Sequence, residues 1–556
     1  MKPKPAMLKL GAASLASGLL LSAAFASSAL GCLAWLALVP MLLVLRGHSL
    51  LAAGLAGLAW GSVAALGTFG WLLEVPAVGP PQATVLALYL ALYPACWCMG
   101  VVRLMRSRAP LLLAAPALWV ALEAVRAQAG FMALPWATLA QSQHHNLALL
   151  QLASLGGEAV VSFVVALGNV AIAGWVAGWV AGWVARFGLG HKPSICSTSS
   201  TDLTWTHPVA LAAGAVLLAH GTGLLMLLAP EAGPVLQVAA IQPSIGVAER
   251  NSAAGREAIW QRLHDLTWAA ANSAPASRQQ PLLVVWPETA VGDPQHDAQL
   301  AARLAALARA SHTALVVGAA ETEKFRATEG QQAVLLEREQ FNSAYLVAPN
   351  APLSAPYRKR RLLPFGETVP LQSYVVWPRW LVPDILSGQA GDHPANFWLA
   401  RDGATALRIG VLICWENTFA ELARDAVRSR AQVLVQLTND AWFGHTHASA
   451  QHNAISVLRA VENHVPVVIA SNSGRSQIIN ARGRIVAQGP GLFEQGTATA
   501  AVAVGAAGTL YTRTGDVWAW ACAAVAAVSL LAPSRPARVH RPEPVFQARP
   551  FIKESP

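Results

Sequence analysis

The stretch Leu407-Arg408-Ile409-Gly410-Val411-Leu412-Ile413-Cys414-Trp415-Glu416 decides how the most polar part of this chain folds. Its apolar, β-branched run predicts a buried strand that ends where Cys414 begins a loop. Cys414 is the only cysteine between Val235 and Gly505. Most cysteines beside such runs are inert core residues. A thiol with no disulfide partner in its own domain nevertheless points to a chemical role, and its neighbours decide which one.

Two further motifs supply the groups that a reactive thiol needs. Glu288 follows the predicted strand Leu282–Val285, and Lys359 lies in Tyr357-Arg358-Lys359. Alone, each has a plain alternative, a surface glutamate or a solvated basic face. Together, thiol, carboxylate and ammonium predict acyl transfer, with Cys414 as nucleophile, Glu288 as base, and Lys359 and the Trp415 N–H as donors to the oxyanion. The ammonium is also expected to lower the pKa of Cys414 below about 8.5.

The composition places much of the 556-residue chain in lipid. Hydrophobic residues make up 54% and charged residues only 12%, where a soluble protein has roughly 25% charged residues. The mean hydropathy is +0.42. Of the net charge of +10, the segment 235–505, with 23 Lys+Arg and 21 Asp+Glu, holds only +2. No basic patch stands out on that segment, so nucleic acid is not expected as a partner.

Eight apolar runs approach the roughly 20 residues that span a bilayer. They are Leu8–Ala26, Leu30–Leu45, Leu51–Leu73, Thr84–Val102, Ala109–Val125, Ala159–Val184, Val209–Leu228 and Val517–Leu531. Every even-numbered run exits into a basic loop or tail, which predicts cytoplasmic termini and a segment 235–505 outside the cytoplasm. The segment Met1–Ala26 also has the features of a cleavable signal peptide. Cleavage would leave the remaining topology unchanged.

The segment 235–505 has the length of one domain. Short β-branched runs alternate with helical stretches, which predicts an α/β layered fold with buried sheets. The expected strands are Val235–Ile241, Leu282–Val285, Ala314–Val317, Ala344–Val347, Leu407–Ile413, Val433–Leu437, Val467–Ala470 and Gln477–Ile479. The expected helices are Arg256–Ala271, Ala298–Ala310, Phe419–Ser429 and Gln451–Asn463, the last with an internal ion pair between Arg459 and Glu462.

Three other patterns allow two interpretations each. Ala-Gly-Trp-Val occurs three times in Ala173–Val184, either as a helix contact through small residues or as a neutral repeat expansion. The segment Gln128–Leu150 is either an interfacial connector or part of a substrate entrance. His445, His447 and His452 do not have the spacing of a standard zinc site, so no metal is expected.

Four motifs together resemble the nitrilase superfamily, and within it the apolipoprotein N-acyltransferases, membrane enzymes that complete bacterial lipoproteins. The resemblance covers the whole chain. The motifs are Val285-Trp286-Pro287-Glu288, Tyr357-Arg358-Lys359 with Leu363-Pro364-Phe365-Gly366-Glu367, Ile413-Cys414-Trp415-Glu416, and Asn439-Asp440-Ala441-Trp442-Phe443-Gly444.

The resemblance implies a helical membrane bundle of about eight spans and a nitrilase-like α-β-β-α sandwich. The corresponding domains are residues 1–230, residues 231–508 on the periplasmic face, and residues 509–556 with the last helix and a basic cytoplasmic tail. It implies a Glu288–Lys359–Cys414 triad without metal or cofactor. The supporting or substrate-binding residues would be Glu367, Trp415, Glu416 and Trp442.

The resemblance also implies the substrates and the location. The donor would be a phospholipid, which gives its acyl chain to Cys414 as a thioester. The acceptor would be the α-amino group of the diacylglyceryl-cysteine at the N-terminus of an apolipoprotein. A monomer in the bacterial inner membrane is expected. Two alternatives stay open, a membrane-anchored amidase that hydrolyses a C–N bond and a non-catalytic binding relative. The chain departs from the family pattern at Pro243, Asn251, Trp415, Val465 and Arg475.

Overall fold

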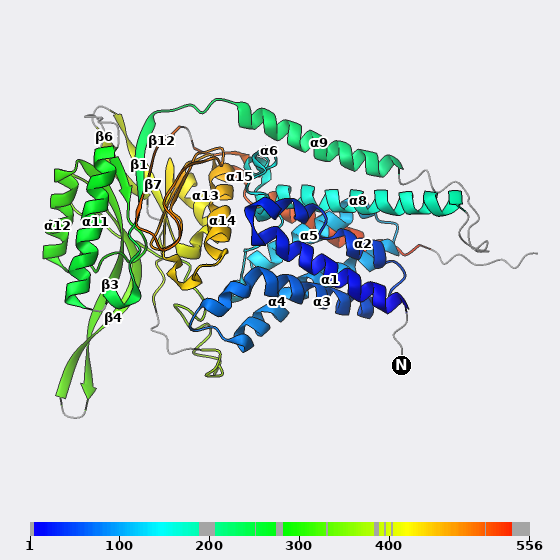
Figure 1. Cartoon of the computed structure of the whole chain (residues 1–556), viewed down its shortest axis with the longest axis horizontal. Helices are drawn as coiled ribbons and strands as arrows, with labels where there is room; N and C mark the ends of the chain where they lie inside the picture. The colour runs from blue at the N-terminus through cyan, green and yellow to red at the C-terminus, as the bar shows by residue number, and fades with distance from the viewer. Residues whose placement is uncertain are drawn as a thin grey trace, which may run out of the picture.

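The computed structural model describes residues 5–187, 206–250, 252–273, 282–329, 332–382, 388–393, 396–401, 404–505 and 507–535. The chain forms a helical half and an α/β half, which lie end to end (Figure 1). The helical half contains the long helices α1 (Pro5–Ala26), α3 (Leu50–Phe69), α4 (Pro80–Met105), α5 (Leu111–Ala127), α8 (Glu158–Phe187), α9 (Thr206–Leu228) and α16 (Val517–Leu531). Shorter helices there are η1 (Ser28–Trp35), α2 (Val39–Val44), η2 (Gly70–Glu74), η3 (Gly130–Met132), η4 (Gln141–Gln143), α6 (Leu147–Leu150) and α7 (Ala153–Gly156).

Two six-stranded sheets form the centre of the α/β half. The first has the order β12-β1-β2-β3-β4-β5 and the second the order β11-β10-β9-β8-β7-β6. The strands of the first sheet are β1 (Val235–Gln242), β2 (Leu282–Val285), β3 (Thr313–Glu329), β4 (Gln332–Val347), β5 (Tyr357–Arg358) and β12 (Gly496–Ala503). Those of the second are β6 (Asn396–Arg401), β7 (Ala404–Ile413), β8 (Val433–Thr438), β9 (Val467–Ser471), β10 (Gln477–Ile479) and β11 (Ile485–Gln488).

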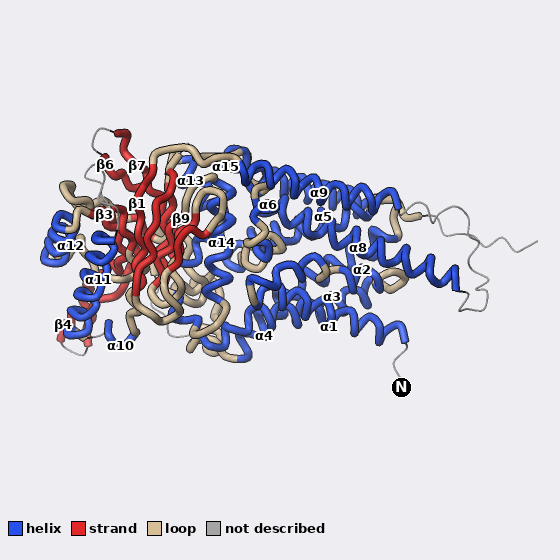
Figure 2. Tube along the Cα trace, turned by 45° about the horizontal axis from the view of Figure 1, so that its top comes forward, coloured by secondary structure: helices blue, strands red, loops and turns tan. Residues whose placement is uncertain are grey.

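Apolar side chains hold the two sheets face to face. One buried cluster joins β1, β2 and β3 to β7, β8 and β9. Helices α11 (Ala253–Ser273) and α12 (Ala298–Ala310) cover the first sheet, while α13 (Ala420–Arg428) and α14 (Ala448–Asn463) cover the second. Figure 2 shows the strands between these helix layers. The predicted α/β layered fold is therefore confirmed, and α13 and α14 lie between the second sheet and the helical half (Figure 1).

The predicted elements of this half are all present, although their bounds differ. Each of the eight expected strands lies inside an observed strand, and the four expected helices correspond to α11, α12, α13 and α14. Four strands were not predicted. Of these, β5 has only two residues, and β12 (GTATAAVA) consists of small residues that pair antiparallel with β1.

Five helices among the described residues are long and apolar enough to span a membrane. They are Pro5–Ala26, Leu50–Glu74, Pro80–Met105, Glu158–Val180 and Pro208–Leu228. The other expected spans are Leu30–Leu45, Ala109–Val125 and Val517–Leu531. They correspond to η1 with α2, to α5 and to α16, which are all shorter than those five helices. The structure therefore supports a membrane-embedded half and does not fix the number of its spans at eight.

The expected span Leu30–Leu45 is wrong as one continuous helix. It is divided into η1 and α2, with Pro40 in the first turn of α2. Proline has no N–H to continue a helix, so the chain restarts there. Asn169 of α8 satisfies the interrupted backbone, because its amide accepts from Leu38 N at 2.9 Å and donates to Ala34 O at 2.9 Å. A break in lipid is tolerated when a neighbouring side chain replaces the lost hydrogen bonds.

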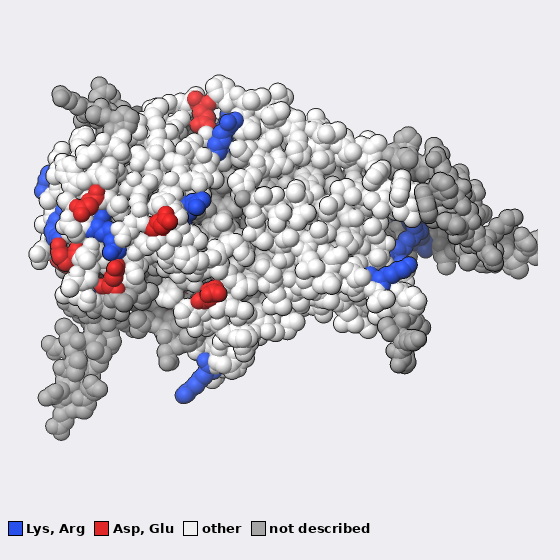
Figure 3. Space-filling view, viewed as in Figure 1, with Lys and Arg blue, Asp and Glu red and all other residues white. Residues whose placement is uncertain are grey.

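Charge is distributed unevenly along the molecule. On the face shown in Figure 3, charged side chains gather over the α/β half and basic ones at the opposite end, with a largely uncharged surface between them.

In the Ala-Gly-Trp-Val repeat of α8, Trp175 and Trp179 are exposed and a Cβ on Gly178 would meet nothing within 4 Å. Trp175, Trp179 and Gly178 therefore make no close helix contact with the part of the chain that the structure describes.

Candidate active site

Cys414 lies at the carboxyl end of β7, where the strand turns into the short helix η6 (Cys414–Thr418). Its side chain is half-buried and packs against the apolar clusters on both faces of the second sheet. Its φ is +54°, in the left-handed region that non-glycine residues rarely adopt. Such backbone strain persists only where surrounding contacts fix it and is common at functional sites. Here the Cys414 carbonyl lies 3.2 Å from Nε2 of His452.

Lys359 and Glu288 meet beside this turn. Lys359, directly after β5, is wholly buried, and its Nζ lies 2.7 Å from Glu367 Oε1 and 3.4 Å from Glu288 Oε1. Burial alone would lower the pKa of Lys359, but the carboxylates of Glu367 and Glu288 raise it well above its usual value. Lys359 is therefore a fixed ammonium. Glu288 is held in turn by the Asn342 amide, which donates to its Oε1 at 2.6 Å.

A close backbone approach positions the Glu288 loop. A Cβ on Gly318 of β3 would lie 2.2 Å from Pro287 O, so only glycine lets the strand pass so near the loop. The adjacent Thr289 adopts a φ of +47°. Glu288 therefore lies at the carboxyl end of β2, facing Lys359 at the end of a different strand.

The electrostatics of the thiol differ from the sequence-based expectation. Burial and the carboxylate of Glu288 raise the pKa of Cys414 well above its usual value, and the Lys359 ammonium offsets only part of this increase. The predicted low pKa of Cys414 is therefore wrong. The main reason is burial of the thiol, and the carboxylates of Glu288 and Glu367 add to it. Burial therefore favours the neutral thiol.

Glu416 organises the turn that follows the cysteine. It is fully buried and accepts hydrogen bonds from the backbone N–H groups of Ile413, Arg360 and Arg361 at 2.8, 2.7 and 3.1 Å, and from Tyr357 Oη at 2.9 Å. Its carboxylate therefore joins the lysine segment to the cysteine segment.

The other predicted supporting residues fall into two groups. Glu367 contacts Lys359 directly and also accepts from Leu363 N at 2.7 Å. The Trp415 indole donates to Arg361 O at 2.6 Å and packs edge-on against Phe419. Trp442 lies in η7 (Asp440–Phe443) with half of its surface exposed, and within the described residues it forms no hydrogen bond with Lys359 or Glu288. Of the four supporting residues, Trp442 is therefore the one that the structure does not bring into direct contact with the lysine–cysteine region.

Two family models match the chain. The carbon-nitrogen hydrolase model matches residues 237–511, and that of the apolipoprotein N-acyltransferase N-terminal domain matches residues 17–171. An apolipoprotein N-acyltransferase of Geobacter metallireducens is 34% identical over 528 residues, which cover 92% of this chain and 93% of that protein. The chain belongs to the apolipoprotein N-acyltransferase family. Another apolipoprotein N-acyltransferase, from Chlorobaculum tepidum, is 28% identical over 431 residues and covers 76% of each chain.

Solved structures of the nitrilase superfamily are similar to about half of the chain. An amidase from Nesterenkonia sp. is 18% identical and covers 51% of this chain and 94% of its own, with a TM-score of 0.33. Nit3 from Saccharomyces cerevisiae, a member of branch 10 of the superfamily, is 18% identical and covers 49% and 91%, with a TM-score of 0.34.

Of the departures of this apolipoprotein N-acyltransferase family member, only Trp415 lies in the lysine–cysteine region, among those that the structure describes. Val465 is buried just before β9, while Arg475 is exposed and reaches Gln488 Oε1 at 3.4 Å. Pro243 follows β1, and its carbonyl accepts from Arg262. Asn251 lies outside the described residues.

Sequence reasoning missed two partners of the site. Asn342, which holds Glu288, carries no motif signal. His452 was considered only as a zinc ligand, yet its Nδ1 lies 3.1 Å from Asp440 Oδ1 while its Nε2 approaches the Cys414 carbonyl. His445 instead stacks on Phe493 with ring centroids 4.5 Å apart. Asp440 belongs to the motif Asn439-Asp440, but His452 lies 12 positions further along the chain, so the motif alone does not indicate the pair.

Proposed function

We propose that the enzyme transfers an acyl chain from a phospholipid to Cys414 and then to the α-amino group of an apolipoprotein's N-terminal diacylglyceryl-cysteine. The observation that carries the proposal is the buried Lys359 ammonium between Glu288 and Glu367, beside a thiol on a strained turn. This arrangement suits an acyl transfer that passes through a covalent intermediate.

In the first half-reaction, Glu288 accepts the proton of the Cys414 thiol as the sulfur attacks an ester carbonyl of the phospholipid. The carbonyl oxygen becomes negative, and the Lys359 ammonium with the Trp415 N–H provides donors to it. The C–O bond then breaks. The leaving alkoxide takes the proton from Glu288 and departs as a lysophospholipid, which leaves a thioester on Cys414.

In the second half-reaction, the neutral amine of the acceptor attacks the thioester carbonyl. Glu288 takes a proton from the attacking nitrogen and returns it to the sulfur as the C–S bond breaks. An amide forms and the thiol is restored. The second carboxylate, Glu367, has a separate role, because it keeps Lys359 charged in a buried site where desolvation favours the neutral amine.

Both substrates are lipids, which accounts for the attached helical half. A largely apolar cavity lies between α1, α3, α4 and α5 and is lined in part by Phe25 and Thr68, the residues whose carbonyls accept from Gln451 of α14. We assign it to part of an acyl chain.

The same proposal includes the location and domain plan. Eight spans, counting the divided η1–α2 segment, α5 and α16, would place both termini in the cytoplasm and the α/β half in the periplasm of the inner membrane. The domains would be residues 1–230, 231–508 and 509–556, acting as a monomer without metal or cofactor. Cysteine labelling with a membrane-impermeant reagent in spheroplasts tests the orientation.

Replacement of Cys414 by alanine or serine tests the reaction. The wild-type enzyme in phospholipid micelles should gain the mass of one fatty acyl chain, removable by hydroxylamine, and should lose it when a diacylglyceryl lipopeptide is added. The variants should gain nothing. Persistent lipopeptide N-acylation by the alanine variant would refute the proposal. Release of ammonia from simple amides, without acyl transfer, would instead support the amidase.

A further inference from the structure

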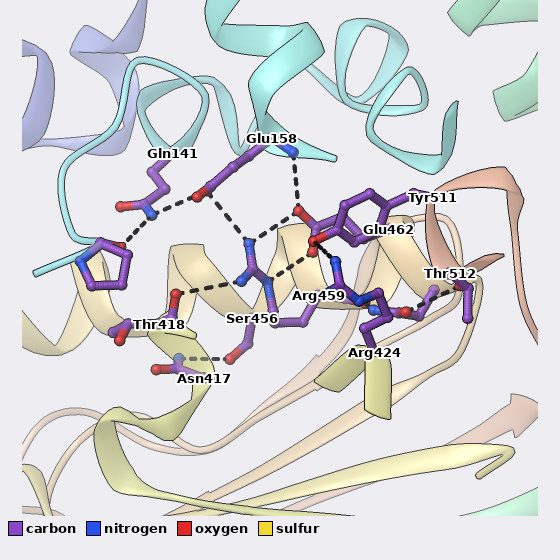
Figure 4. Close-up of polar contacts among 12 residues, drawn as sticks. Gln141, Glu158, Asn417, Thr418, Arg424, Ser456, Arg459, Glu462, Tyr511 and Thr512 are labelled. Atoms are coloured by element: carbon purple, nitrogen blue, oxygen red, sulfur yellow. Dashed lines mark hydrogen bonds and ion pairs between the residues drawn. The ribbon is translucent and has the colours of Figure 1, made fainter. Parts of the chain in front are cut away.

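A buried ion cluster joins the two halves of the molecule behind the nucleophile turn. Arg459 of α14 is fully buried, and its guanidinium lies 3.0 Å from Glu462 Oε2 and 3.4 Å from Glu158 Oε2. Glu462 belongs to the same helix of the α/β half. Glu158 is the first residue of α8 in the helical half, 301 positions away from Arg459. Figure 4 shows the three side chains converging from the two halves.

The cluster fixes the start of a membrane helix. The Glu158 backbone N–H donates to Glu462 Oε1 at 3.0 Å, so a carboxyl group of the α/β half caps the 30-residue helix α8. This oxygen satisfies one of the backbone N–H groups that the first turn of a helix leaves unpaired. The Glu158 side chain is held in place by Gln141 Nε2 at 3.2 Å and Thr138 Oγ1 at 3.3 Å, both in the helical half.

The same guanidinium reaches the turn that carries the nucleophile. Arg459 Nη1 donates to Thr418 O, the last residue of η6, at 3.4 Å. One turn earlier on α14, Ser456 Oγ accepts from Asn417 Nδ2 at 2.9 Å. His452, a further turn back, lies beside the Cys414 carbonyl. Residues 452, 456 and 459 share one helix face, so α14 holds η6 from its first residue to its last. Figure 4 shows the contacts to Asn417 and Thr418.

Stability alone does not require charged groups at this position. The free-energy cost of removing buried charges from water often exceeds their mutual attraction, and well-packed apolar side chains often give equal or greater stability. Removal of one partner, in contrast, leaves an uncompensated buried charge. An apolar contact cannot fix the relative orientation of its partners. The planar guanidinium can, because it contacts two carboxyl groups and one carbonyl at fixed angles.

We propose that Arg459 is a positioning residue that sets the orientation of the nucleophile turn relative to the membrane helices, through its shared contacts with Glu158, Glu462 and the Thr418 carbonyl. The proposal rests on the proposed acyl transfer, because only that reaction requires the thiol to stand at a fixed depth relative to a lipid. A misplacement of about 1 Å lowers the rate of such a reaction by about 100-fold.

The test compares Arg459→Gln and Glu158→Gln with Arg424→Gln in the full-length enzyme. Arg424 is a matched control, because it also ties the α/β half to the entry of α16, through Asp516 Oδ2 at 3.2 Å and Tyr511 Oη at 3.4 Å. Within the described residues, its guanidinium forms no hydrogen bond with η6. Each variant is assayed for acylation of Cys414 by phospholipid, for alkylation of Cys414 by iodoacetamide, and for thermal unfolding.

We expect Arg459→Gln and Glu158→Gln to lower the acylation rate at saturating phospholipid by about 10- to 100-fold. The phospholipid concentration for half-maximal rate should not change, because no lipid contact is removed. Arg424→Gln should lower the unfolding temperature and leave the acylation rate unchanged. If Arg459→Gln does not fold, the acylation rate of Glu158→Gln alone tests the proposal.

Two outcomes would overturn the proposal. One is a full acylation rate in folded Arg459→Gln or Glu158→Gln, and the other is an equal rate loss in Arg424→Gln, which would indicate a general stability effect. Failure of the acyl-transfer function gives a different result from failure of the positioning role. If the function is wrong, the wild-type enzyme forms no acyl-Cys414. A slower iodoacetamide reaction of the Arg459 and Glu158 variants, compared with the Arg424 variant, would still report a displaced thiol.

Discussion

Replacing the base should make the nucleophile more acidic. Glu288 and Glu367 place two negative charges around the single ammonium of Lys359, and the pKa of the Cys414 thiol is raised by burial and by Glu288. Glu288→Gln removes one of those charges and keeps the side-chain volume. We therefore expect a lower pKa of Cys414 in this variant, although acyl transfer is lost with the base.

The size of the effect follows from Coulomb's law. Two unit charges about 6 Å apart interact by about 3 kcal/mol at an effective dielectric constant of about 20. Below the thiol pKa, removing this repulsion raises the thiolate fraction about 100-fold. A less basic thiolate is also a weaker nucleophile, with a Brønsted coefficient of about 0.4–0.5. The net expectation is an alkylation of Cys414 about tenfold faster than in the wild type.

The assay is the rate of Cys414 carbamidomethylation by iodoacetamide between about pH 6 and pH 9, followed by peptide mass. The wild-type rate should still be rising at the upper end of this range. Glu257→Gln is a suitable control, since Glu257 forms an exposed ion pair with Arg303 away from the site. Slower alkylation in Glu288→Gln would refute the reasoning, because it would show that Glu288 already holds the thiol proton in the resting enzyme.

Three further changes test the same site. Glu416→Ala strands four hydrogen-bond donors at about 1–3 kcal/mol each, so it should abolish folding of the α/β half, whereas Glu416→Gln should lower the unfolding temperature by a smaller amount. Lys359→Met should reduce lipopeptide acylation by at least about 100-fold, as the loss of an oxyanion donor does, and mass spectrometry should find no accumulated thioester. Burial raises the pKa of Glu462 to about 8, above the about 4.3 of an unfolded glutamate. The folded state therefore keeps a proton that the unfolded state releases, and stability should fall as pH rises between these values. Glu462→Gln should flatten that dependence of the unfolding temperature.

The sequence predicted those parts of the fold that local pattern determines. The run Leu407–Ile413 was assigned to a strand because burial on both faces selects continuous β-branched residues, and β7 ends as expected at Ile413. Strand β12 was missed because its small residues give no such signal. The expected span Leu30–Leu45 is not one continuous helix. Pro40 interrupts it and Asn169 of α8 accepts from the backbone at the break, and hydropathy shows neither effect.

The chemistry of the site was only partly accessible from motifs. The residue types of Cys414, Lys359 and Glu288 match the reaction, and the structure brings Lys359 to Glu288. The predicted direction of the Cys414 pKa shift is wrong because burial of the thiol and the nearby carboxylates outweigh the ammonium. Glu367 stands only eight positions from Lys359, yet its distance in space could not be known from its distance in the chain.

Contacts between the halves were the least predictable. The internal pair of Arg459 and Glu462 was expected from helix spacing and is confirmed at 3.0 Å. The third member, Glu158, begins a membrane helix that local reasoning treats only as an apolar span. A carboxylate at the first position of such a helix would ordinarily be assigned to the water interface. Its contact with the buried Arg459, at 3.4 Å, means instead that α8 starts against the α/β half. The helical half therefore contacts the helix that holds the nucleophile turn, and is more than an anchor for it.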